Sequence, residues 1–303
     1  MSLCTPANCI VFSENSRCIN MAAFEIKELK VTYGRSTTPA LVDVTLSIES
    51  GSFTVVLGSN GSGKSTFLRC LGGFQPWQRG SILKDGISRA IDKPGFNSEQ
   101  ILISEDIVLP QFKLKELARI YKEIWPSFDV ATFRRILKYS EISEDTAPGR
   151  LSRGQKILCQ FALGLSSGVK TLLVDEVTAA LDPYVRRKVI LELVEKNRSG
   201  ATVVIATNIV TEVQHLDVAM VILKEGKIFF SGRHSEIRNR FIKVQTREES
   251  SHLLRGKFVE VGGAMGVIYA VGYRDSIEGE IVKEAGVPSL EDVFVFLSHE
   301  GKT

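Results

Sequence analysis

The chain has 303 residues, with 38 lysines and arginines against 35 aspartates and glutamates, a formal net charge of +3. Hydrophobic residues make up 44% and charged residues 24%, which is ordinary for a globular protein and excludes disordered, collagen-like and coiled-coil chains. No part of the chain has the concentrated basic face that binds a phosphate backbone, so we expect no nucleic acid partner. The length accommodates one large domain with an addition, or two domains.

Cysteine use and hydropathy favour a cytoplasmic protein. The five cysteines are odd in number and match no zinc-binding spacing, which predicts free thiols in a reducing compartment. No apolar run reaches the roughly 18 residues that span a bilayer, and the N-terminus lacks the segments of a signal peptide. Regular patterning starts near Met21, so we expect residues 1–20 to be a disordered extension, or Met21 to be the natural start.

The first part of the chain predicts strands that lead into a glycine-rich loop. Residues 24–33 have the partial alternation of a strand, and apolar side chains recur at every second position over 42–48. The apolar run 53–57 predicts a buried strand, which continues directly into the loop. The short helix after the loop is expected to end at Gly72 and Gly73.

The middle of the chain predicts helices. Pro126 ends the first of them and Asp129 is a suitable N-cap for the second, while a third is expected over about 155–166. The first helix is expected to have one apolar face, formed by Leu114, Leu117, Ile120, Tyr121 and Ile124.

Strands and helices alternate in the rest of the chain, including a helix over 209–216 that follows an apolar strand. Such alternation with wholly apolar strands predicts a parallel sheet covered by helices. Glu225 and Gly226 indicate a hairpin turn, and residues 263–276 favour a buried β-hairpin. The last helix is expected to start at a capping box, Ser289 with Asp292.

Residues 58–65 match the pattern G-x-x-x-x-G-K-[ST] between a predicted buried strand and a predicted helix. Glycines let backbone amides converge on phosphate oxygens, and the helix that opens at Lys64 directs its positive dipole end to the same place. We expect Lys64 to neutralise the β- and γ-phosphates and Ser65 to hold Mg²⁺. The loop therefore predicts a site for a nucleoside triphosphate and magnesium.

Two carboxylates end the predicted buried strand 172–176. Burying them is unfavourable unless they have a role, so we expect Asp175 to hold Mg²⁺ through water and Glu176 to act as general base on the attacking water. About twenty residues upstream, Ser152 and the amide of Gly154 stand at the start of a predicted helix, where both can contact phosphate.

The order of these motifs along the chain resembles that in the nucleotide-binding subunit of an ABC transporter. The resemblance covers about residues 24–230, and residues 118–143 and 288–297 are similar to the type-2 ABC exporter branch. It implies an α/β P-loop NTPase of ABC type, with a mainly parallel core sheet, an antiparallel β subdomain and a helical subdomain. The expected domains are the ATPase at 21–233, with its helical subdomain at about 107–168, and a small α+β accessory region at 234–303.

The resemblance also implies roles for individual residues. Tyr33 would stack on adenine, and Asp182 would contact the partner subunit. Ser152, Gly154 and Gln155 would act in trans, so that a homodimer or a heterodimer with another ABC ATPase subunit sandwiches two ATP molecules and drives an integral membrane transporter subunit. The phosphates would be cradled by Gly58, Ser59, Asn60, Gly61, Ser62, Gly63, Lys64, Ser65 and Thr66.

Three positions depart from the family pattern. Arg153 replaces a glycine in the signature motif 151–155, and Glu105 stands at the Q-loop position, where it either approaches Mg²⁺ or is an ordinary exposed acid. Asn208 holds the place of the switch histidine. Asparagine cannot carry a positive charge, and the loss of a charge-assisted contact costs about one to two decades in rate. We therefore expect weak or partner-dependent turnover.

The sequence leaves three functions open. The first is an ATPase that drives a separate membrane exporter from the cytoplasmic side, held peripherally at the inner face of the cell membrane by that partner. The second is a weakly hydrolysing, ATP-dependent dimerisation switch beside an active paralogue. The third, a soluble ABC ATPase of DNA repair or translation, is disfavoured because the chain lacks a long coiled-coil insertion, tandem ATPase halves and a basic face.

Overall fold

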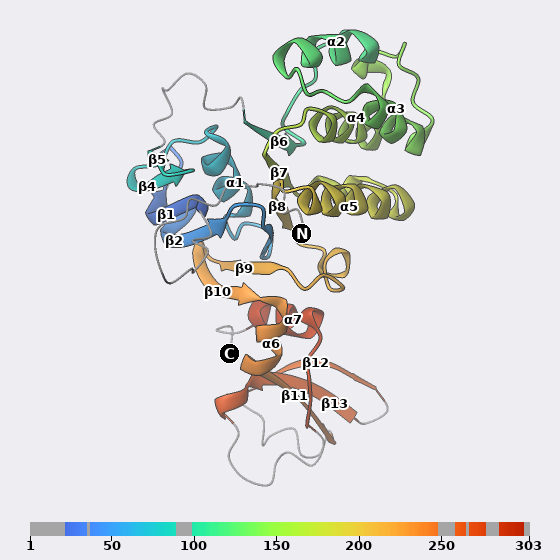
Figure 1. Ribbon diagram of the computed structural model, residues 1–303. Helices are drawn as coiled ribbons and strands as arrows, with labels where there is room; N and C mark the ends of the chain where they lie inside the picture. The colour runs from blue at the N-terminus through green and yellow to red at the C-terminus, as the bar shows by residue number, and fades with distance from the viewer. Residues whose placement is uncertain are drawn as a thin grey trace, which may run out of the picture.

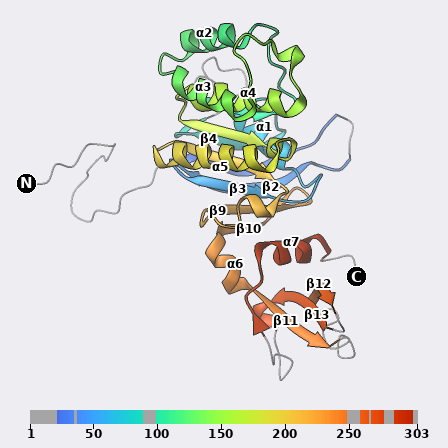
Figure 2. The same cartoon turned by 90° about the vertical axis from the view of Figure 1, so that its right-hand side faces the viewer.

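The computed structural model describes residues 22–34, 37–88, 99–247, 258–264, 267–276 and 285–299. These residues form a core with two sheets, a helical part at one end of it, and an α+β region at the opposite end (Figures 1 and 2). The expected extension at 1–20 and Met21 lie outside the described residues. Within the described part of the chain, no helix has both the length and the apolar character needed to cross a membrane.

The central sheet has six strands in the order β10–β9–β3–β8–β7–β6. All neighbouring pairs are parallel except β9 with β10, which form the predicted hairpin. Because the carboxyl ends of parallel strands meet at one edge, the segments after β3, β7 and β8 come together there. The strands are β3 (Phe53–Leu57), β6 (Gln100–Ser104), β7 (Thr171–Asp175), β8 (Thr202–Thr207), β9 (Ala219–Lys224) and β10 (Lys227–Arg233).

Both faces of the inner strands β3, β7 and β8 are buried, which explains their nearly continuous apolar runs. Val55 of β3 belongs to the cluster that includes the helical part, whereas Val56 belongs to the cluster around α1. Val203 and Val204 of β8 divide between the two clusters in the same way. Successive side chains on a strand point to opposite faces, so a strand covered on both sides reads as a continuous apolar run.

A second, antiparallel sheet has the order β2–β1–β4–β5 and packs over helix α1. Phe67 and Leu68 of α1 are fully buried there. Gly73 ends α1 in the left-handed conformation, with φ 77°, as predicted. The elements are β1 (Ala22–Val31), β2 (Leu41–Glu49), α1 (Lys64–Gly72), β4 (Arg79–Lys84) and β5 (Ile87–Ser88).

The helical part contains α2 (Leu114–Ile124), α3 (Val130–Leu137) and α4 (Arg153–Ser166), and α5 (Pro183–Arg198) follows it on the sheet. Asp129 caps α3 as predicted, since its carboxylate accepts a hydrogen bond from Ala131 N at 2.9 Å. The predicted apolar face of α2 was wrong in part. Leu114 and Leu117 are buried and Tyr121 packs on Phe128, whereas Ile120 and Ile124 are exposed.

Short 3₁₀ helices connect several elements: η1 (Lys138–Ser140), η2 (Pro148–Arg150), η3 (Val177–Ala180), η4 (Val210–Glu212) and η6 (Arg274–Ser276). The helix predicted over 209–216 was wrong, because only the single turn η4 forms after β8. Val210 and Val213 are buried in the core at this turn, which accounts for the apolar spacing without a full helix.

The C-terminal region has a four-stranded sheet in the order β12–β13–β11–β14, covered by α7. The predicted buried hairpin over 263–276 is confirmed only in part: Gly263 and Ala264 at the end of β12 pair with Ile268 and Val267 of β13, residues 265–266 lie outside the described residues, and only residues 270–272 of β13 are buried. Ser289 and Asp292 form the predicted capping box, with bonds of 2.8 and 3.1 Å. The elements are α6 (His234–Arg240), β11 (Phe241–Arg247), β12 (Phe258–Ala264), β13 (Val267–Tyr273), β14 (Ala285–Gly286) and α7 (Leu290–His299).

This region is packed onto the core. Phe241, Tyr273 and Phe296 form a ring cluster with centroids 5.3–5.6 Å apart. Phe241 and Phe296 belong to the same buried cluster as the helical part and the central sheet. The architecture confirms the predicted fold class: a mainly parallel core sheet, an antiparallel β subdomain, a helical subdomain and an α+β addition.

Candidate nucleotide-binding site

The glycine-rich loop joins β3 to α1 at the carboxyl edge of the central sheet. Gly61 and Gly63 have φ angles of 80° and 102°, a conformation that favours glycine. A Cβ at Gly63 would lie 2.5 Å from the carbonyl oxygen of Ala40, and a Cβ at Gly58 would lie 2.5 Å from that of Leu223. The surrounding backbone therefore leaves no room for side chains at the two ends of the loop, as a phosphate cradle requires.

Lys64 and Glu176, predicted separately, are brought together. The Lys64 side chain is 2% exposed, and its ammonium donates to the carbonyl oxygens of Gly58 at 2.7 Å and Ser59 at 2.9 Å. The same ammonium lies 2.6 Å from the Glu176 carboxylate. The loop thus holds its lysine beside the acid that follows β7.

Glu176 has an unusual backbone. Its φ is 50°, in the left-handed region that side chains other than glycine rarely adopt, and its N–H donates to the carbonyl oxygen of Ala206 at 2.9 Å. Such strain persists only where the surroundings impose it, and it is common at functional sites. The bend turns the Glu176 side chain toward Lys64 instead of continuing the strand.

Asp175 has the environment of a cation ligand. It is buried, and its Oδ1 has no hydrogen-bond partner among the described residues. Burial raises the pKa of Asp175, the charge of Glu176 adds to this rise, and a hydrogen bond with Ser65 opposes it. A carboxylate oxygen that has no hydrogen-bond partner and lies near a hydroxyl group suits Mg²⁺, which prefers oxygen ligands. The residues therefore fit the predicted metal.

Tyr33 and Asn208 both contact the loop region. The Tyr33 hydroxyl lies 3.1 Å from Oγ1 of Thr66, and its ring is partly exposed beside the start of α1. The amide of Asn208, which directly follows β8, donates to Oδ1 of Asn60 at 3.1 Å. The structure thus places both residues around residues 58–66.

Ser152, Gly154 and Gln155 form the N-terminal tip of α4. The Ser152 hydroxyl accepts from Gln155 N at 3.3 Å, and Gln155 Oε1 accepts from Ser152 N at 3.1 Å. A Cβ at Gly154 would lie 2.7 Å from the carbonyl oxygen of Ala180, so this glycine permits close packing on η3. Within the described residues, no hydrogen bond or ion pair links this tip to residues 58–66.

Glu105 lies just beyond β6 and is held by Arg153. Both of its carboxylate oxygens lie 2.6 Å from Nη2 of Arg153, and one also accepts from Nε at 3.2 Å. The two substituted positions therefore form an ion pair within one chain.

The sequence reasoning missed a buried carboxylate, Glu212 on η4. Oε2 of Glu212 accepts from the hydroxyls of Thr178 at 2.9 Å and Thr207 at 3.1 Å, and Arg186 lies 3.4 Å from Oε1. Burial raises the pKa of Glu212, while the threonine hydrogen bonds and Arg186 oppose that rise. The network ties η3 to the strand that ends before Asn208. An acid between the apolar residues Val210 and Val213 was the available signal.

Comparison with known proteins agrees with this geometry. Residues 41–179 match the ABC transporter family. The methionine import ATP-binding protein MetN of Symbiobacterium thermophilum is 30% identical over 240 residues, covering 73% of this chain and 72% of the relative. The energy-coupling factor transporter ATP-binding protein EcfA2 of Streptococcus sanguinis is 30% identical over 228 residues, covering 70% and 82%.

A solved structure shares the fold. The dimeric, post-hydrolysis ATP-binding cassette MJ0796, bound to ADP and phosphate, superposes with a TM-score of 0.59 at 23% identity, over 69% of this chain and 98% of that one. The sequence relatives, the matched family and the arrangement of Lys64, Asp175 and Glu176 at the sheet edge lead to one conclusion: the chain belongs to the ABC transporter ATP-binding family.

Proposed function

We propose that this chain binds MgATP at residues 58–66, hydrolyses it, and couples the cycle to a separate integral membrane transporter subunit. The observation that carries the proposal is the junction of Lys64, Asp175 and Glu176. A buried cation, an unpartnered carboxylate oxygen and a second carboxylate converge beside a loop whose end glycines, Gly58 and Gly63, leave no room for a Cβ. Each is a group that phosphoryl transfer requires.

The hydrolytic roles follow from these positions. Lys64 neutralises charge on the β- and γ-phosphates, and Ser65 with Asp175 holds the magnesium ion, which would supply electrostatic stabilisation of the transferred group. Glu176 is the general base, and its partly exposed carboxylate remains accessible to a water molecule. Glu105, expected from the resemblance to approach the metal, is held by Arg153, and we assign it a different role below.

Two side chains complete the site in one subunit. The partly exposed ring of Tyr33 is available to stack on adenine. Asn208 lies beside Asn60 of the loop and hydrogen-bonds the γ-phosphate without the charge that a histidine would bring. Turnover is therefore slow or depends on a partner.

We infer that the active form is a dimer in which each loop faces the α4 tip of the other subunit. The tip carries a serine hydroxyl and a helix N-terminus, both suited to phosphate, yet it makes no hydrogen bond to the loop of its own chain among the described residues. Ser152, Gly154 and Gln155 act in trans, and Asp182 contacts the partner. A homodimer is the simplest assembly, and a heterodimer with another ABC ATPase subunit uses the same surfaces.

The membrane subunit is proposed to hold the chain at the cytoplasmic face of the cell membrane. We propose export, because residues 118–143 and 288–297 resemble the type-2 exporter branch. Import is the second candidate, because several relatives are methionine import ATP-binding proteins. Reconstitution with the membrane protein that co-purifies with this chain separates them: export predicts ATP-driven loss of substrate from the compartment that holds this subunit, and import predicts gain.

The ATPase itself is tested with purified protein. Wild type is expected to bind MgATP and release phosphate, and Lys64→Ala to lose both. Binding without phosphate release would instead support the dimerisation switch, in which Asn208 leaves the subunit nearly inactive. Absence of adenine nucleotide binding in the wild type would contradict both, and salt-sensitive binding to DNA or ribosomes would support a non-transport ATPase.

A further inference from the structure

We propose that Glu105 and Arg153 are a pair of positioning residues that sets the orientation of the α4 tip, and thereby the fit of Ser152 to the nucleotide of the partner subunit. The inference rests on the proposed function, because the tip matters for hydrolysis only if it acts in trans. It gives the two substituted positions one shared role.

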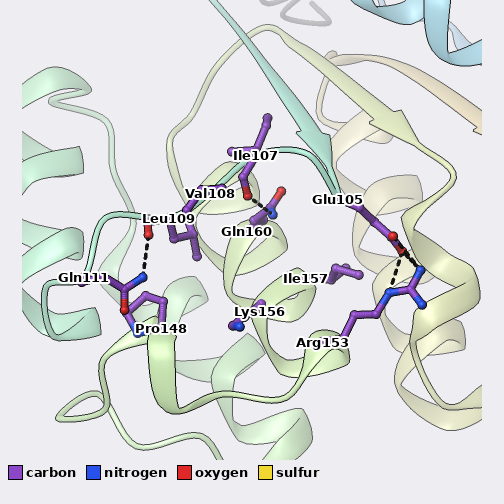
Figure 3. Close-up of a pocket in the computed structure, with 10 residues that line it drawn as sticks. All are labelled: Glu105, Ile107, Val108, Leu109, Gln111, Pro148, Arg153, Lys156, Ile157 and Gln160. Atoms are coloured by element: carbon purple, nitrogen blue, oxygen red, sulfur yellow. Dashed lines mark hydrogen bonds and ion pairs between the residues drawn. The ribbon is translucent and has the colours of Figure 1, made fainter.

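The pair joins two parts of the molecule. Glu105 directly follows strand β6 of the central sheet, and Arg153 is the first residue of α4 in the helical part. Figure 3 shows the two side chains meeting at the rim of a cavity of about 340 Å³ that lies between the segment after β6 and α4. The Arg153 guanidinium donates to the Glu105 carboxylate through Nε and Nη2. This geometry constrains the relative orientation of the two side chains as well as the distance between them.

A second contact lies two turns along the same helix. Gln160 accepts from Ser104 N at 3.2 Å and donates to the carbonyl oxygen of Ile107 at 3.0 Å, so it bonds to the chain on both sides of Glu105. Residues seven apart fall on one face of an α-helix, so Arg153 and Gln160 connect the same face of α4 to the same segment. Together with the packing of its buried residues, these two contacts connect α4 to the end of β6.

The two contacts differ in burial. The Gln160 side chain is buried, and its hydrogen bonds form the fixed end. The side chains of Arg153 and Glu105 are 74% and 38% exposed, so the ion pair at the tip is the end that solvent, salt and substitution can change. The position of the tip therefore depends on this pair.

The tip moves as one unit with Arg153. The reciprocal hydrogen bonds of Ser152 and Gln155 bracket Arg153, and Gly154 packs against Ala180. A rotation of the Arg153 backbone is therefore passed to the Ser152 hydroxyl. Small errors in the placement of such a group weaken binding because a hydrogen bond depends steeply on geometry.

The pairing also explains the two substitutions together. A lone arginine at the tip would bring an uncompensated charge next to the dimer surface, and a lone carboxylate after β6 would repel the phosphates of its own site. Opposite charges at these positions cancel. We therefore expect each residue to be tolerated only in the presence of the other.

The test is a charge exchange. ATP-dependent dimerisation is followed by sedimentation in a Glu176→Gln background, for Glu105→Arg, Arg153→Glu and the double variant. Each single variant is expected to raise the dimer dissociation constant about two- to fivefold, the range for an exposed ion pair, and the exchanged pair to restore it. High salt should remove the differences. Nucleotide affinity of the monomer is measured in parallel, so that an effect on the variant's own site is separated from an effect on dimerisation.

The matched control is the ion pair Arg134–Glu144, which lies within the helical part at 2.7 Å. Arg134→Glu and Glu144→Arg should leave dimerisation unchanged. The melting temperature of every variant is measured, and Glu105→Gln and Arg153→Lys replace any charge-reversed chain that fails to fold. Glu105→Gln should match the single variants. Arg153→Lys keeps the charge but loses the contact through two nitrogens, so it should lie between the single variants and wild type.

Three outcomes would overturn the proposal: single variants that dimerise like the parent, a double variant whose defect is the sum of the single ones, or a Glu105→Gln variant that raises only the Mg²⁺ requirement. The last would make Glu105 a metal ligand. Loss of nucleotide binding by the unmodified chain would instead refute the proposed function and is read from the monomer titration.

Discussion

The ammonium of Lys64 lies 2.6 Å from the carboxylate of Glu176, although the two residues belong to different strand–helix connections. The left-handed backbone of Glu176 makes this contact possible, since an extended residue would carry the carboxylate away with the chain. The fold of the chain itself thus holds the proposed general base, Glu176, against the proposed phosphate-binding lysine, Lys64.

Glu176→Gln removes the base but keeps the size of the side chain. We expect steady-state ATP hydrolysis to fall by about 10²-fold or more, the usual contribution of a general base, with nucleotide affinity retained. Phosphate release and equilibrium binding measure the two quantities. Glu195→Gln, an exposed position on α5, is the control. An equal loss of hydrolysis in both variants would contradict the assignment of Glu176 as general base.

Asn208→His restores a side chain that can carry a positive charge beside Asn60. A charge-assisted hydrogen bond to the γ-phosphate is worth roughly 1–3 kcal/mol, so hydrolysis should rise by about one to two decades. The comparison uses purified wild type and variant at saturating MgATP. Equal or lower activity in the variant would show that Asn208 does not limit turnover.

The Asp175→Asn variant is expected to have a more stable fold but no Mg²⁺-dependent hydrolysis. Burial raises the pKa of Asp175, so its ionised form destabilises the folded protein, and this loss develops as pH rises through the folded pKa. The variant should therefore melt higher than wild type at neutral pH, by about 2–4 °C for each kcal/mol relieved. The advantage should shrink as pH falls through the folded pKa, while Mg²⁺-dependent hydrolysis is lost at every pH.

Melting curves without nucleotide across this pH range provide the check. A variant that melts lower than wild type at neutral pH would mean that the Asp175 carboxylate stabilises the fold through contacts stronger than its desolvation.

Gly154→Ala tests the packing of the α4 tip. The new Cβ would lie 2.7 Å from the carbonyl oxygen of Ala180, so the tip must shift at a cost of about 1–3 kcal/mol. Urea unfolding measures the loss, and ATP-dependent dimerisation should weaken with it. Gly262→Ala is the matched control, because nothing lies within 4 Å of the added carbon. Equal stability of the two variants would contradict the close packing of Gly154 against Ala180.

Local patterns made much of the fold and site predictable. The loop 58–66 is one short segment in which the conformation depends on the residue types of the loop itself. Asp129, Gly73 and the Ser289–Asp292 box are helix caps, which depend only on residues within one turn. Such features depend on few neighbours, so the sequence alone specifies them.

Contacts between distant segments were harder to predict. Glu105 and Arg153 were recognised singly as substitutions, but 48 residues separate them and only the packing of α4 against the end of β6 joins them. Likewise, the helical spacing placed Ile120 and Ile124 on a predicted buried face, but both side chains are exposed. Periodicity identifies an apolar face but does not say what packs against it.

The cysteines show both what the sequence predicts and what only the structure reveals. Cys70 and Cys159 are free and buried, which agrees with the predicted thiols, and burial raises the pKa of each to about 12. Cys4, Cys9 and Cys18 lie outside the described residues. Chain spacing excluded a zinc site, but only packing shows that the two described thiols are chemically protected.

The composite site is tested most directly by mixing two inactive variants. Lys64→Ala removes the phosphate-binding cation, whereas Ser152→Asp keeps the helix cap and places a negative charge where phosphate should bind. In a symmetric dimer, the mixed species keeps one intact pair of loop and tip, so an equimolar mixture should recover about a quarter of wild-type hydrolysis. A mixture as inactive as its two components would contradict the account that each nucleotide is held between two subunits.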